Sequence, residues 1–409
     1  MIYIKKKKFG KPFKNAVSNI KSTQIKWAWI KYVATKKKLF NKNSENIFYK
    51  KIFLKWIPIL NFLSSFFSSK KVGGSLLYCN AKHYESIFTN FFRRIKLEDV
   101  SYRYYSPISV DWIRFKLNIK KFHISEYKWQ GNEKQLSSLN FVKLIDAIIY
   151  KDLKTIKPNR IFLVEGDSYI HNLINKNAKL LKIKTITIQN GYNIYLDPVI
   201  TWKNINSDIY ISRGYANTKF LKNHSTAKFI TTGILNNKRS NFYKNKLYHV
   251  CFILQPDKNN KFLDYIFDVS KKYKKFNFLI KLHPSSKFKI EKKINNLKNI
   301  TIYKKTENMN YLKNSRFIIS EYSSVLIESL EYNCVPIAVY KFYNKTILKY
   351  LPLKKLGFCF RDFRSLKEIE EKIFLKEHDS FSHKWNINKN YFLGNYKQTD
   401  IRIIKNLCK

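Results

Sequence analysis

The fold of this chain is decided by residues 160–191, which read RIFLVEGDSYIHNLINKNAKLLKIKTITIQNG. Two short apolar runs, residues 160–165 and 185–189, flank a stretch with helical spacing over about residues 170–181. Apolar runs of this length separated by a helix are typical of buried parallel strands joined by a crossover. Because the connections are short, the stretch predicts a βαβ unit in a parallel sheet.

The same alternation extends on both sides of this unit. A first series adds strands over residues 75–79, 207–212 and 228–232 and a helix over about 140–154. A second series has strands over residues 250–254, 277–282, 300–303, 317–320 and 335–340, with helices over 263–273 and 325–332. The sequence therefore predicts an α/β protein with two Rossmann-like, doubly wound domains facing a cleft.

The predicted domain organisation has four parts. The two domains divide near residues 236–247, and no internal repeat or long linker is visible. The parts are a basic aromatic segment (1–71), an amino-terminal Rossmann-like domain (72–240), a carboxyl-terminal Rossmann-like domain (241–361) and closing helices that pack back toward the first domain (362–409).

The charge of the 409-residue chain is +51. Such an excess of lysine and arginine can indicate nucleic acid, an anionic membrane or an acidic substrate. It is also what an A+T-rich genome imposes, since Lys, Asn, Ile, Phe and Tyr are abundant while Arg, Ala and Gly are scarce. Zinc-finger spacing, an RNP-like aromatic strand and a recognition helix are all missing from the sequence, so we expect no nucleic-acid partner.

Cysteine usage and targeting signals favour a cytoplasmic protein. The start of the chain lacks the pattern of a signal peptide, and the apolar run over residues 52–67 is shorter than the roughly 20 residues that span a bilayer. We expect reduced, mostly buried thiols, because the cysteines lie far apart without a C-x-x-C pair. We expect no metal site, because His, Cys, Asp and Glu do not gather at ligand spacings. The cysteines are Cys79, Cys251, Cys334, Cys359 and Cys408.

The first 71 residues are rich in lysine and contain Glu45 as their only acid. Trp27, Trp29, Trp56 and the apolar run over 52–67 lie among the lysines. A basic, aromatic segment of this kind can bind anionic lipid head groups, which predicts peripheral attachment to the inner face of the cytoplasmic membrane. The alternative is that these residues form helices packed on the sheet of the first domain.

Polar residues follow the predicted strand over 317–320. Ser323 and Ser324 come at its carboxyl end and open the next helix, where free backbone N–H groups favour an anion such as phosphate. Glu328, in the first turns of that helix, can accept both hydroxyls of a ribose. The alternatives are an ordinary serine N-cap and a glutamate that is either solvated or stabilises the helix dipole.

His283 and Pro284 end the strand over residues 277–282. The proline stops the strand and directs the imidazole out of its end, where it can donate to a phosphate oxygen. A lone histidine is more often structural, but this one is predicted at the same sheet edge as the serine pair.

The acidic turn comprises Glu165, Gly166 and Asp167 at the carboxyl end of the strand over 160–165. Either carboxylate can act as a base, and the glycine allows substrate to approach closely. The alternative is that Asp167 or Ser168 only caps the following helix. Gln189, Asn190 and Gly191 end the next strand, and their amides can hold a sugar hydroxyl; a plain glycine-containing turn is the alternative.

These motifs resemble a known family. KLHP with His283, SEYSS with Ser323 and Ser324, and EGD over residues 165–167 resemble bacterial GT-B sialyltransferases and polysialyltransferases, and more loosely teichoic-acid glycerophosphotransferases. The resemblance implies a metal-independent GT-B glycosyltransferase without a cofactor, in which the HP and serine motifs contact the donor phosphate. The acidic motif reads EGD instead of two acids followed by glycine, so the base is either Glu165 or Asp167.

The resemblance also implies partners and a process. The donor is a nucleotide-activated sugar bound by the second domain, for example a CMP-activated, sialic-acid-like one. The acceptor is a glycan or lipid-linked glycan at the first domain, and the process is capsule, lipopolysaccharide or O-antigen biosynthesis.

A second resemblance leads to UDP-N-acetylglucosamine 2-epimerases, whose GDT, HP and SGG segments parallel VEGDS, LHP and ISEYSS of this chain. Here Tyr322, Ser323 and Ser324 replace Ser-Gly-Gly, and the His-x-Glu-Ala-Gly run of the epimerases is missing. We expect a transferase, with an epimerase or nucleotide-sugar hydrolase as the alternative and a non-catalytic anion-binding protein as the third.

Overall fold

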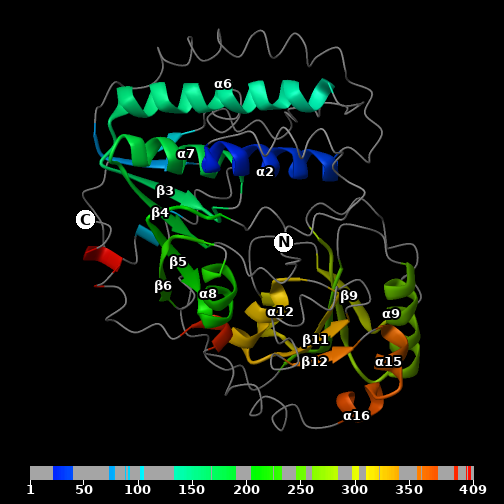
Figure 1. Cartoon of the computed structure of the whole chain (residues 1–409). Coiled ribbons are helices and arrows are strands. Elements are labelled where there is room, and N and C mark those ends of the chain that lie inside the picture. Colours follow the sequence, from blue (N-terminus) through cyan, green and yellow to red (C-terminus); the bar gives the residue numbers. More distant parts are fainter. Residues whose placement is uncertain are drawn as a thin grey trace.

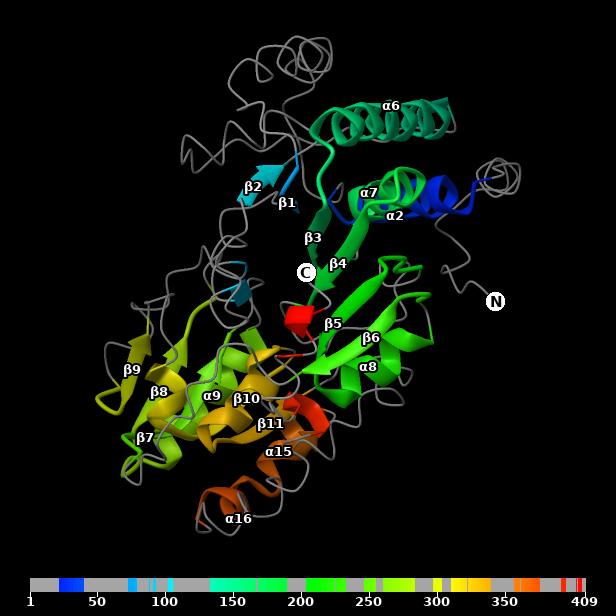
Figure 2. The ribbon, with the colours of Figure 1, turned by 90° about the vertical axis from the view of Figure 1, so that its left-hand side faces the viewer.

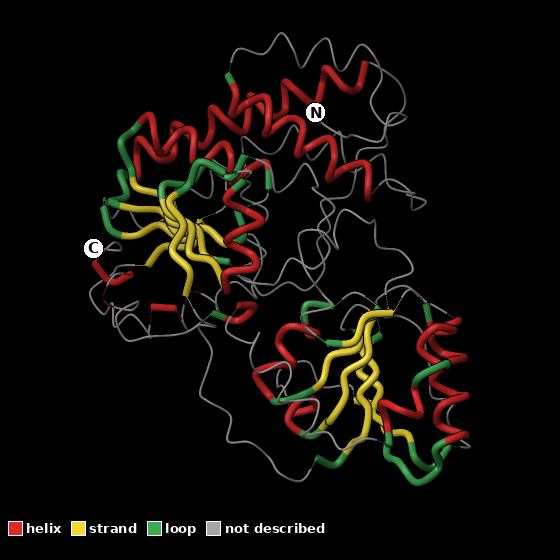
Figure 3. Tube along the Cα trace, turned by 60° about the horizontal axis from the view of Figure 1, so that its bottom comes forward, coloured by secondary structure: helices red, strands yellow, loops and turns green. Residues whose placement is uncertain are grey.

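Two parallel β-sheets, each flanked by helices, form the molecule (Figure 1, Figure 3). The computed structural model describes residues 22–39, 73–78, 88, 91–92, 102–105, 133–166, 168–189, 204–223, 225–232, 246–254, 260–283, 297–303, 310–321, 323–339, 357–360, 362–375, 391–394, 402 and 404–406.

The first sheet has six strands in the order β2-β1-β3-β4-β5-β6, all parallel. The predicted βαβ unit lies at its centre as β3, α7 (Tyr169–Leu180) and β4, and is confirmed. The strands are β1 (Ser75–Tyr78), β2 (Tyr102–Tyr105), β3 (Arg160–Val164), β4 (Lys184–Ile188), β5 (Ile209–Arg213) and β6 (Lys228–Thr232).

Successive side chains along the strands point alternately into two separate cores. Leu76 and Tyr78 of β1 pack under α2 (Thr23–Leu39), α6 (Glu133–Ile156) and α7, whereas Leu77 faces the opposite core. This alternation is the period of two that a strand imposes. Burial on both faces explains why the strands read as continuous apolar runs.

The position of α2 corrects one prediction about the amino-terminal segment. The side chain of Trp29, on α2, is fully buried in the core beneath this helix. Trp27 packs against the same core. Insertion of Trp29 into a membrane is therefore wrong, and the alternative of a helix packed on the domain holds for α2. Trp56 and the run over 52–67 lie outside the described residues. No helix in the described part of the chain is long and apolar enough to cross a membrane.

The second sheet also has six parallel strands, in the order β12-β11-β10-β7-β8-β9. Helix α9 (Asn260–Lys272) covers one face, together with α15 (Phe363–Lys367) and α16 (Glu370–Phe374) (Figure 1). The strands are β7 (Tyr248–Ile253), β8 (Phe278–Lys281), β9 (Ile300–Tyr303), β10 (Ser315–Ser320), β11 (Val335–Val339) and β12 (Phe358–Phe360).

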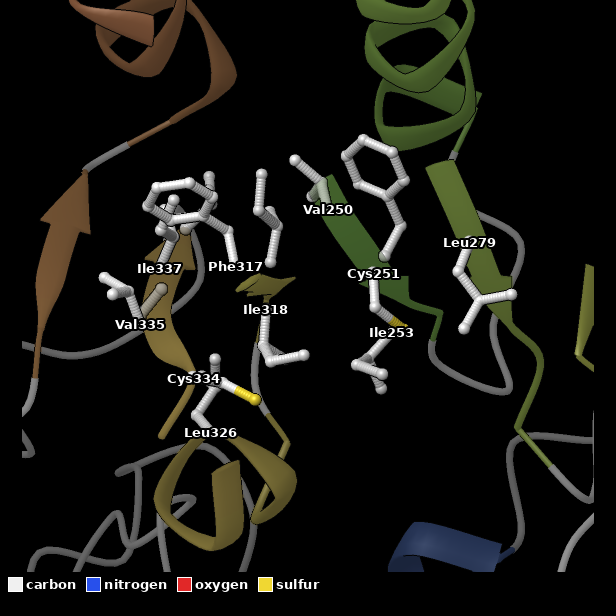
Figure 4. Close-up of a cluster of buried hydrophobic side chains, with 14 of the residues drawn as sticks. Val250, Cys251, Ile253, Leu279, Phe317, Ile318, Leu326, Cys334, Val335 and Ile337 are labelled. Atoms are coloured by element: carbon white, nitrogen blue, oxygen red, sulfur yellow. The ribbon is translucent and has the colours of Figure 1, made fainter. Parts of the chain in front are cut away.

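The opposite face of this sheet carries α11 (Asn310–Lys313), α12 (Val325–Glu328) and the 3-10 helix η2 (Ser329–Tyr332). Cys251 and Cys334 lie in this core as buried free thiols, as predicted (Figure 4). Burial raises the pKa of the Cys334 thiol to about 11, which keeps it protonated and inert at neutral pH.

Segments from the end of the chain lie in both cores. Phe392 and Leu393 belong to the core of the second domain, and they share it with Ala216 from α8 (Gly214–Lys222) of the first. Ile404 instead packs in the core of the first domain. The short red segment near the end of the chain lies beside the first sheet (Figure 2). The domain division near 236–247 falls largely on residues 233–245, outside the described part of the chain, and stays a prediction.

Candidate functional site

The order of the strands places a topological switch point between β7 and β10 of the second sheet. From β7 the chain first adds β8 and β9 on one side and then β10, β11 and β12 on the other. The Ser320 hydroxyl at the end of β10 donates to the Ile253 carbonyl at the end of β7, at 3.1 Å. Doubly wound sheets bind ligands outside the carboxyl ends of such strands, which is where Ser323 and Ser324 follow.

The two serines differ in their local bonds. The Ser323 hydroxyl accepts a bond from the Val325 backbone N–H, at 3.3 Å, which leaves its own proton available for a ligand. The Ser324 hydroxyl donates to Glu328 Oε1, at 3.4 Å. The predicted helix over residues 325–332 is split into α12 and the 3-10 helix η2, each of four residues. The dipole of so short a helix is small. Binding of an anion here therefore depends more on the hydroxyls of Ser323 and Ser324 than we expected.

Glu328 is half-buried. Burial raises the pKa of its carboxyl, and the positive charge of Arg213 and the bond from Ser324 oppose that rise. Its place in the first turn of α12 also fits the alternative of a dipole-stabilising glutamate, so the ribose contact stays a prediction. Arg213 ends β5 of the first sheet, so this electrostatic influence on Glu328 comes from the other domain.

His283 lies two residues beyond the end of β8 and is exposed. The Leu254 N–H after β7 bonds to the carbonyl of Lys281, at 3.0 Å, which aligns the ends of β8 and β7. With a spacing of about 4.8 Å per strand, the ends of β8 and β10 are ~10 Å apart. His283 and the serines thus share one sheet edge; Pro284 lies outside the described residues.

Charge at His283 is disfavoured. Partial burial lowers the pKa of its imidazole, and the nearby Lys281 ammonium lowers it further. The neutral ring keeps one N–H, which can still donate to a phosphate oxygen.

The acidic turn occupies the switch point of the first sheet, between β1 and β3. Glu165 and Gly166 both have left-handed backbones, with φ of 67° and 76°. Non-glycine residues rarely adopt this conformation, and it persists only where surrounding bonds enforce it. Here the Glu165 N–H bonds to the Ile188 carbonyl at 2.9 Å, and the Tyr210 hydroxyl donates to the Glu165 carbonyl at 3.2 Å.

Ser168 caps α7, which was one of the two alternatives for this turn. Its hydroxyl accepts from the His171 N–H at 3.3 Å, and His171 Nδ1 accepts from the Ser168 N–H at 3.1 Å, forming a capping box. Burial, and secondly the charge of Lys31, lower the pKa of His171 to about 3, so the ring is neutral. Asp167 lies outside the described residues.

Gln189 does not have the predicted contact with a sugar. It is fully buried, and its side-chain carbonyl accepts a bond from the Arg213 N–H, at 2.7 Å. A residue without exposed surface cannot touch a substrate, so that prediction is wrong for Gln189. Asn190 and Gly191 lie outside the described residues.

Arg213, whose charge opposes the rise in the pKa of Glu328, was not singled out from the sequence. It stands between a strand and Gly214, at the carboxyl edge of the sheet, in the run SRG. A basic residue at that position is the signal that could have revealed it. Within the described part of the chain, no three His, Cys, Asp or Glu side chains gather as metal ligands; metal independence stays a prediction.

No model of a known protein family matches the sequence, and no curated protein matches it. Solved structures do match. One is UDP-GlcNAc 2-epimerase from Neisseria meningitidis bound to UDP-GlcNAc, with a TM-score of 0.50 at 16% identity, over 83% of this chain and 99% of that one.

Two further solved structures match. The glycotransferase of kitacinnamycin has a TM-score of 0.53 at 7% identity, over 83% of this chain and 99% of that one. MurG from Acinetobacter baumannii has a TM-score of 0.51 at 11% identity, over 82% of this chain and 99% of that one. At these identities the likeness concerns the fold, and the expected fold is confirmed: the chain has the two-domain, parallel-sheet GT-B architecture.

Proposed function

We propose that this protein is a glycosyltransferase that moves a sugar from a nucleotide-activated donor to a glycan acceptor. The observation that carries the proposal is the joint position of Ser323, Ser324 and Glu328 at the switch point of the second sheet. Hydroxyl donors beside a carboxylate suit a ligand with a phosphate at one end and a diol at the other.

The donor half of the reaction depends on these groups. Ser323 and the neutral imidazole of His283 donate to the phosphate, which gains negative charge as the bond between the anomeric carbon and the phosphate oxygen breaks. Glu328 accepts the ribose hydroxyls. The proton of Ser324 holds the Glu328 carboxylate in place, so this serine acts on the ribose through Glu328, and Ser323 and His283 serve the phosphate.

The acceptor half depends on the acidic turn. Glu165 or Asp167 takes the proton of the acceptor hydroxyl as its oxygen attacks the anomeric carbon, and the nucleotide leaves with the original bonding pair. The enforced left-handed backbone at Glu165 supports a role for this turn, because strain of this kind clusters at functional sites.

The finer assignment follows from the motif resemblance. The donor is a CMP- or other nucleotide-activated sugar, the acceptor is a glycan or lipid-linked glycan of the cell surface, and the enzyme works without a metal. The basic residues of the first 71 hold it at the anionic inner face of the membrane, where such acceptors are found.

The second candidate is an epimerase of the UDP-N-acetylglucosamine 2-epimerase type. It is favoured by the fold similarity to the Neisseria meningitidis enzyme, whose structure holds UDP-GlcNAc. The same Ser323, Ser324 and Glu328 groups would then hold the nucleotide, and no acceptor would take part.

One experiment separates the two candidates. Titration calorimetry with CMP, UDP and CDP identifies the nucleotide, and the matching nucleotide sugars are then incubated with and without a panel of glycan acceptors in the presence of EDTA. A transferase releases nucleotide in proportion to the acceptor elongated. An epimerase converts the donor to its 2-epimer without acceptor, and a protein that binds none of the three nucleotides has neither function.

A further inference from the structure

The backbone carbonyl of Leu282 is bonded by a lysine side chain. Strand β8 ends at Lys281, so Leu282 lies beyond the ladder of hydrogen bonds that the strand makes with its neighbours. A carbonyl that leaves a ladder needs another hydrogen-bond partner. Lys281 Nζ supplies one by donating to the Leu282 oxygen at 2.7 Å. The last residue of the strand therefore holds the backbone just before His283.

The ammonium of Lys281 is turned toward the protein. A lysine at the end of a strand ordinarily extends its charged group into water, but Lys281 is only 8% exposed. Its Nζ lies 5.9 Å from the ring centre of Tyr303, at the end of β9, and 6.0 Å from that of Tyr311, on α11. The faces of aromatic rings attract a cation at such distances. The two rings thus help to keep the ammonium beside the Leu282 carbonyl.

This bond fixes the position from which His283 projects. A peptide group is planar, so the carbonyl of Leu282 moves as one unit with the N–H and Cα of His283. The preceding peptide group is held as well, because the Leu254 N–H after β7 bonds to the Lys281 carbonyl at 3.0 Å. Strands β7, β8 and β9 lie side by side in the second sheet (Figure 2). His283 is exposed, yet the two peptide groups before it are both tied to this sheet.

We propose that Lys281 is a positioning residue for His283: its buried ammonium holds the peptide group between Leu282 and His283 and so places the imidazole at the carboxyl edge of the second sheet. The step from the imidazole to a donor phosphate rests on the proposed function. The bond from Lys281 to the peptide group is a property of the protein without ligand. Residues that lock a functional group in this way are part of a site although they do not touch the ligand.

The charge of Lys281 gives the proposal a second readout, at the imidazole itself. Partial burial lowers the pKa of His283, and the Lys281 ammonium lowers it further. Two other titratable groups near Lys281 are the Tyr311 phenol and the Cys251 thiol of β7, and burial raises the pKa of both. Both are therefore neutral at physiological pH, and of these three groups Lys281 alone is charged.

The test compares Lys281→Met with Lys281→Arg, His283→Ala and the double variant Lys281→Met/His283→Ala. Methionine keeps an apolar side chain between the two rings but has no proton to donate, so we expect this variant to fold. Arginine keeps a cation that can both donate and lie over the rings. Lys298→Met is the matched control, because it removes an exposed lysine just before β9.

The first measurement observes the peptide group directly. Only one of the eight histidines, His283, follows a leucine in the sequence. Protein with 13C-carbonyl leucine and 15N-histidine therefore gives a single HNCO cross peak, from the Leu282 carbonyl and the His283 N–H. We expect Lys281→Met to shift the carbonyl resonance upfield, because the oxygen loses a charged donor. Lys281→Arg controls for the change of a neighbouring residue.

The same samples report the titration of the His283 ring, whose NMR signal is assigned by its loss in His283→Ala. In Lys281→Met the pKa of the ring should rise, since the nearby positive charge is gone. In Lys281→Arg and Lys298→Met both the cross peak and the titration should stay close to those of the parent.

The second measurement is calorimetry with UDP and CMP and with the nucleosides uridine and cytidine. A misplaced imidazole loses its bond to the phosphate, so Lys281→Met should weaken UDP or CMP by roughly ten-fold, as His283→Ala does. The nucleosides, which lack the phosphate, should bind as they do to the parent. In the double variant the two losses should not add, because Lys281 acts through His283.

The outcomes separate the two proposals. An unchanged cross peak and ring titration in Lys281→Met overturn the role of Lys281. A loss of affinity that is equal for nucleoside and nucleotide, or additive to that of His283→Ala, overturns it too. If the parent protein binds neither UDP nor CMP, the proposed function fails, and the two NMR measurements alone decide whether Lys281 positions His283.

Discussion

Gln189 and Arg213 are joined by a 2.7 Å hydrogen bond that links the carboxyl ends of β4 and β5. A glutamine that we expected to meet substrate instead fixes an arginine, and the arginine acts on Glu328 of the other domain. The proposed nucleotide site is therefore influenced by charge from the first domain. Substitutions there are expected to alter binding without touching a ligand.

The two serines are expected to behave differently when each is replaced by alanine. Ser323→Ala removes a donor to phosphate and should weaken UDP or CMP by about ten-fold to a hundred-fold while leaving a nucleoside unaffected. Ser324→Ala removes the bond to Glu328 and should weaken nucleoside and nucleotide alike. Calorimetry with uridine and UDP, or cytidine and CMP, measures both.

Ser329→Ala is the control for the serine variants. Its hydroxyl donates to the Leu326 carbonyl within the same helical segment, at 2.8 Å and buried. The variant should lose about 1 kcal/mol of stability and no affinity. Identical ligand profiles for Ser323→Ala and Ser324→Ala would contradict the division of labour between the two serines.

The acidic turn is expected to control turnover and not donor binding. Glu165→Gln or Asp167→Asn should lower the transfer rate by about 10² to 10⁴ at whichever residue is the base. Tyr210→Phe removes the donor to the Glu165 carbonyl and should lower the rate by less, because it loosens the turn without removing a carboxylate. Single-turnover rates measured beside the donor Kd test this; full rates in both carboxylate variants would show that the base lies elsewhere.

His171 makes the free energy of unfolding depend on pH. Its pKa is about 3 in the folded protein against an ordinary 6.5, so between these values the unfolded chain binds a proton that the folded one does not. Stability is therefore full above about pH 6.5 and falls on acidification by about 1.4 kcal/mol per pH unit. Urea titrations between pH 5 and 8 measure the slope.

The matched variant is His171→Gln. A glutamine at this position can still accept from the Ser168 N–H and preserve the capping box, but it does not titrate. The pH slope of the parent should exceed that of this variant by the contribution of one histidine. Equal slopes would mean that His171 is protonated in the folded protein.

Gly214→Ala and Gly73→Ala form a matched pair for the domain contact. Both glycines have positive φ, +72° and +87°, so alanine is strained by a similar amount at each, about 1 to 2 kcal/mol. Only at Gly214 would the new Cβ strike the Phe392 backbone, whereas nothing lies within 4 Å at Gly73. We expect a further loss of at least 1 to 3 kcal/mol for Gly214→Ala in urea unfolding; equal losses would contradict this packing.

Strands with a strong local pattern could be predicted from sequence, while elements that depend on distant partners could not. The expected bounds of β6 and β9 match the structure, and those of β1, β3 and β8 differ by a residue or so. The edge strand β2 was missed because its sequence, YRYY, becomes a strand through pairing with β1. The helix α8 was missed because its first residue is a glycine and no side chain caps it.

In the candidate site, residues at strand ends were found because strand ends can be read from the sequence. What each side chain does there depends on the neighbouring strand, as Gln189 shows. The prediction for Trp29 was wrong for a related reason. Lysines surround it in the sequence, but Trp29 lies on the same buried face of α2 as Ile25 and Ala28. Lys31 of the same helix is buried as well. The pattern of charges in the sequence does not indicate its burial.

The burial of Ile404 in the first domain constrains when that domain can fold during synthesis. It is 1% exposed in the core of the first domain, beside Leu77 and Phe162. A ribosome delivers those two residues more than two hundred residues before it delivers Ile404. The first domain therefore cannot complete its core until residue 404 has been synthesised, and the nascent chain keeps an apolar surface open over that interval.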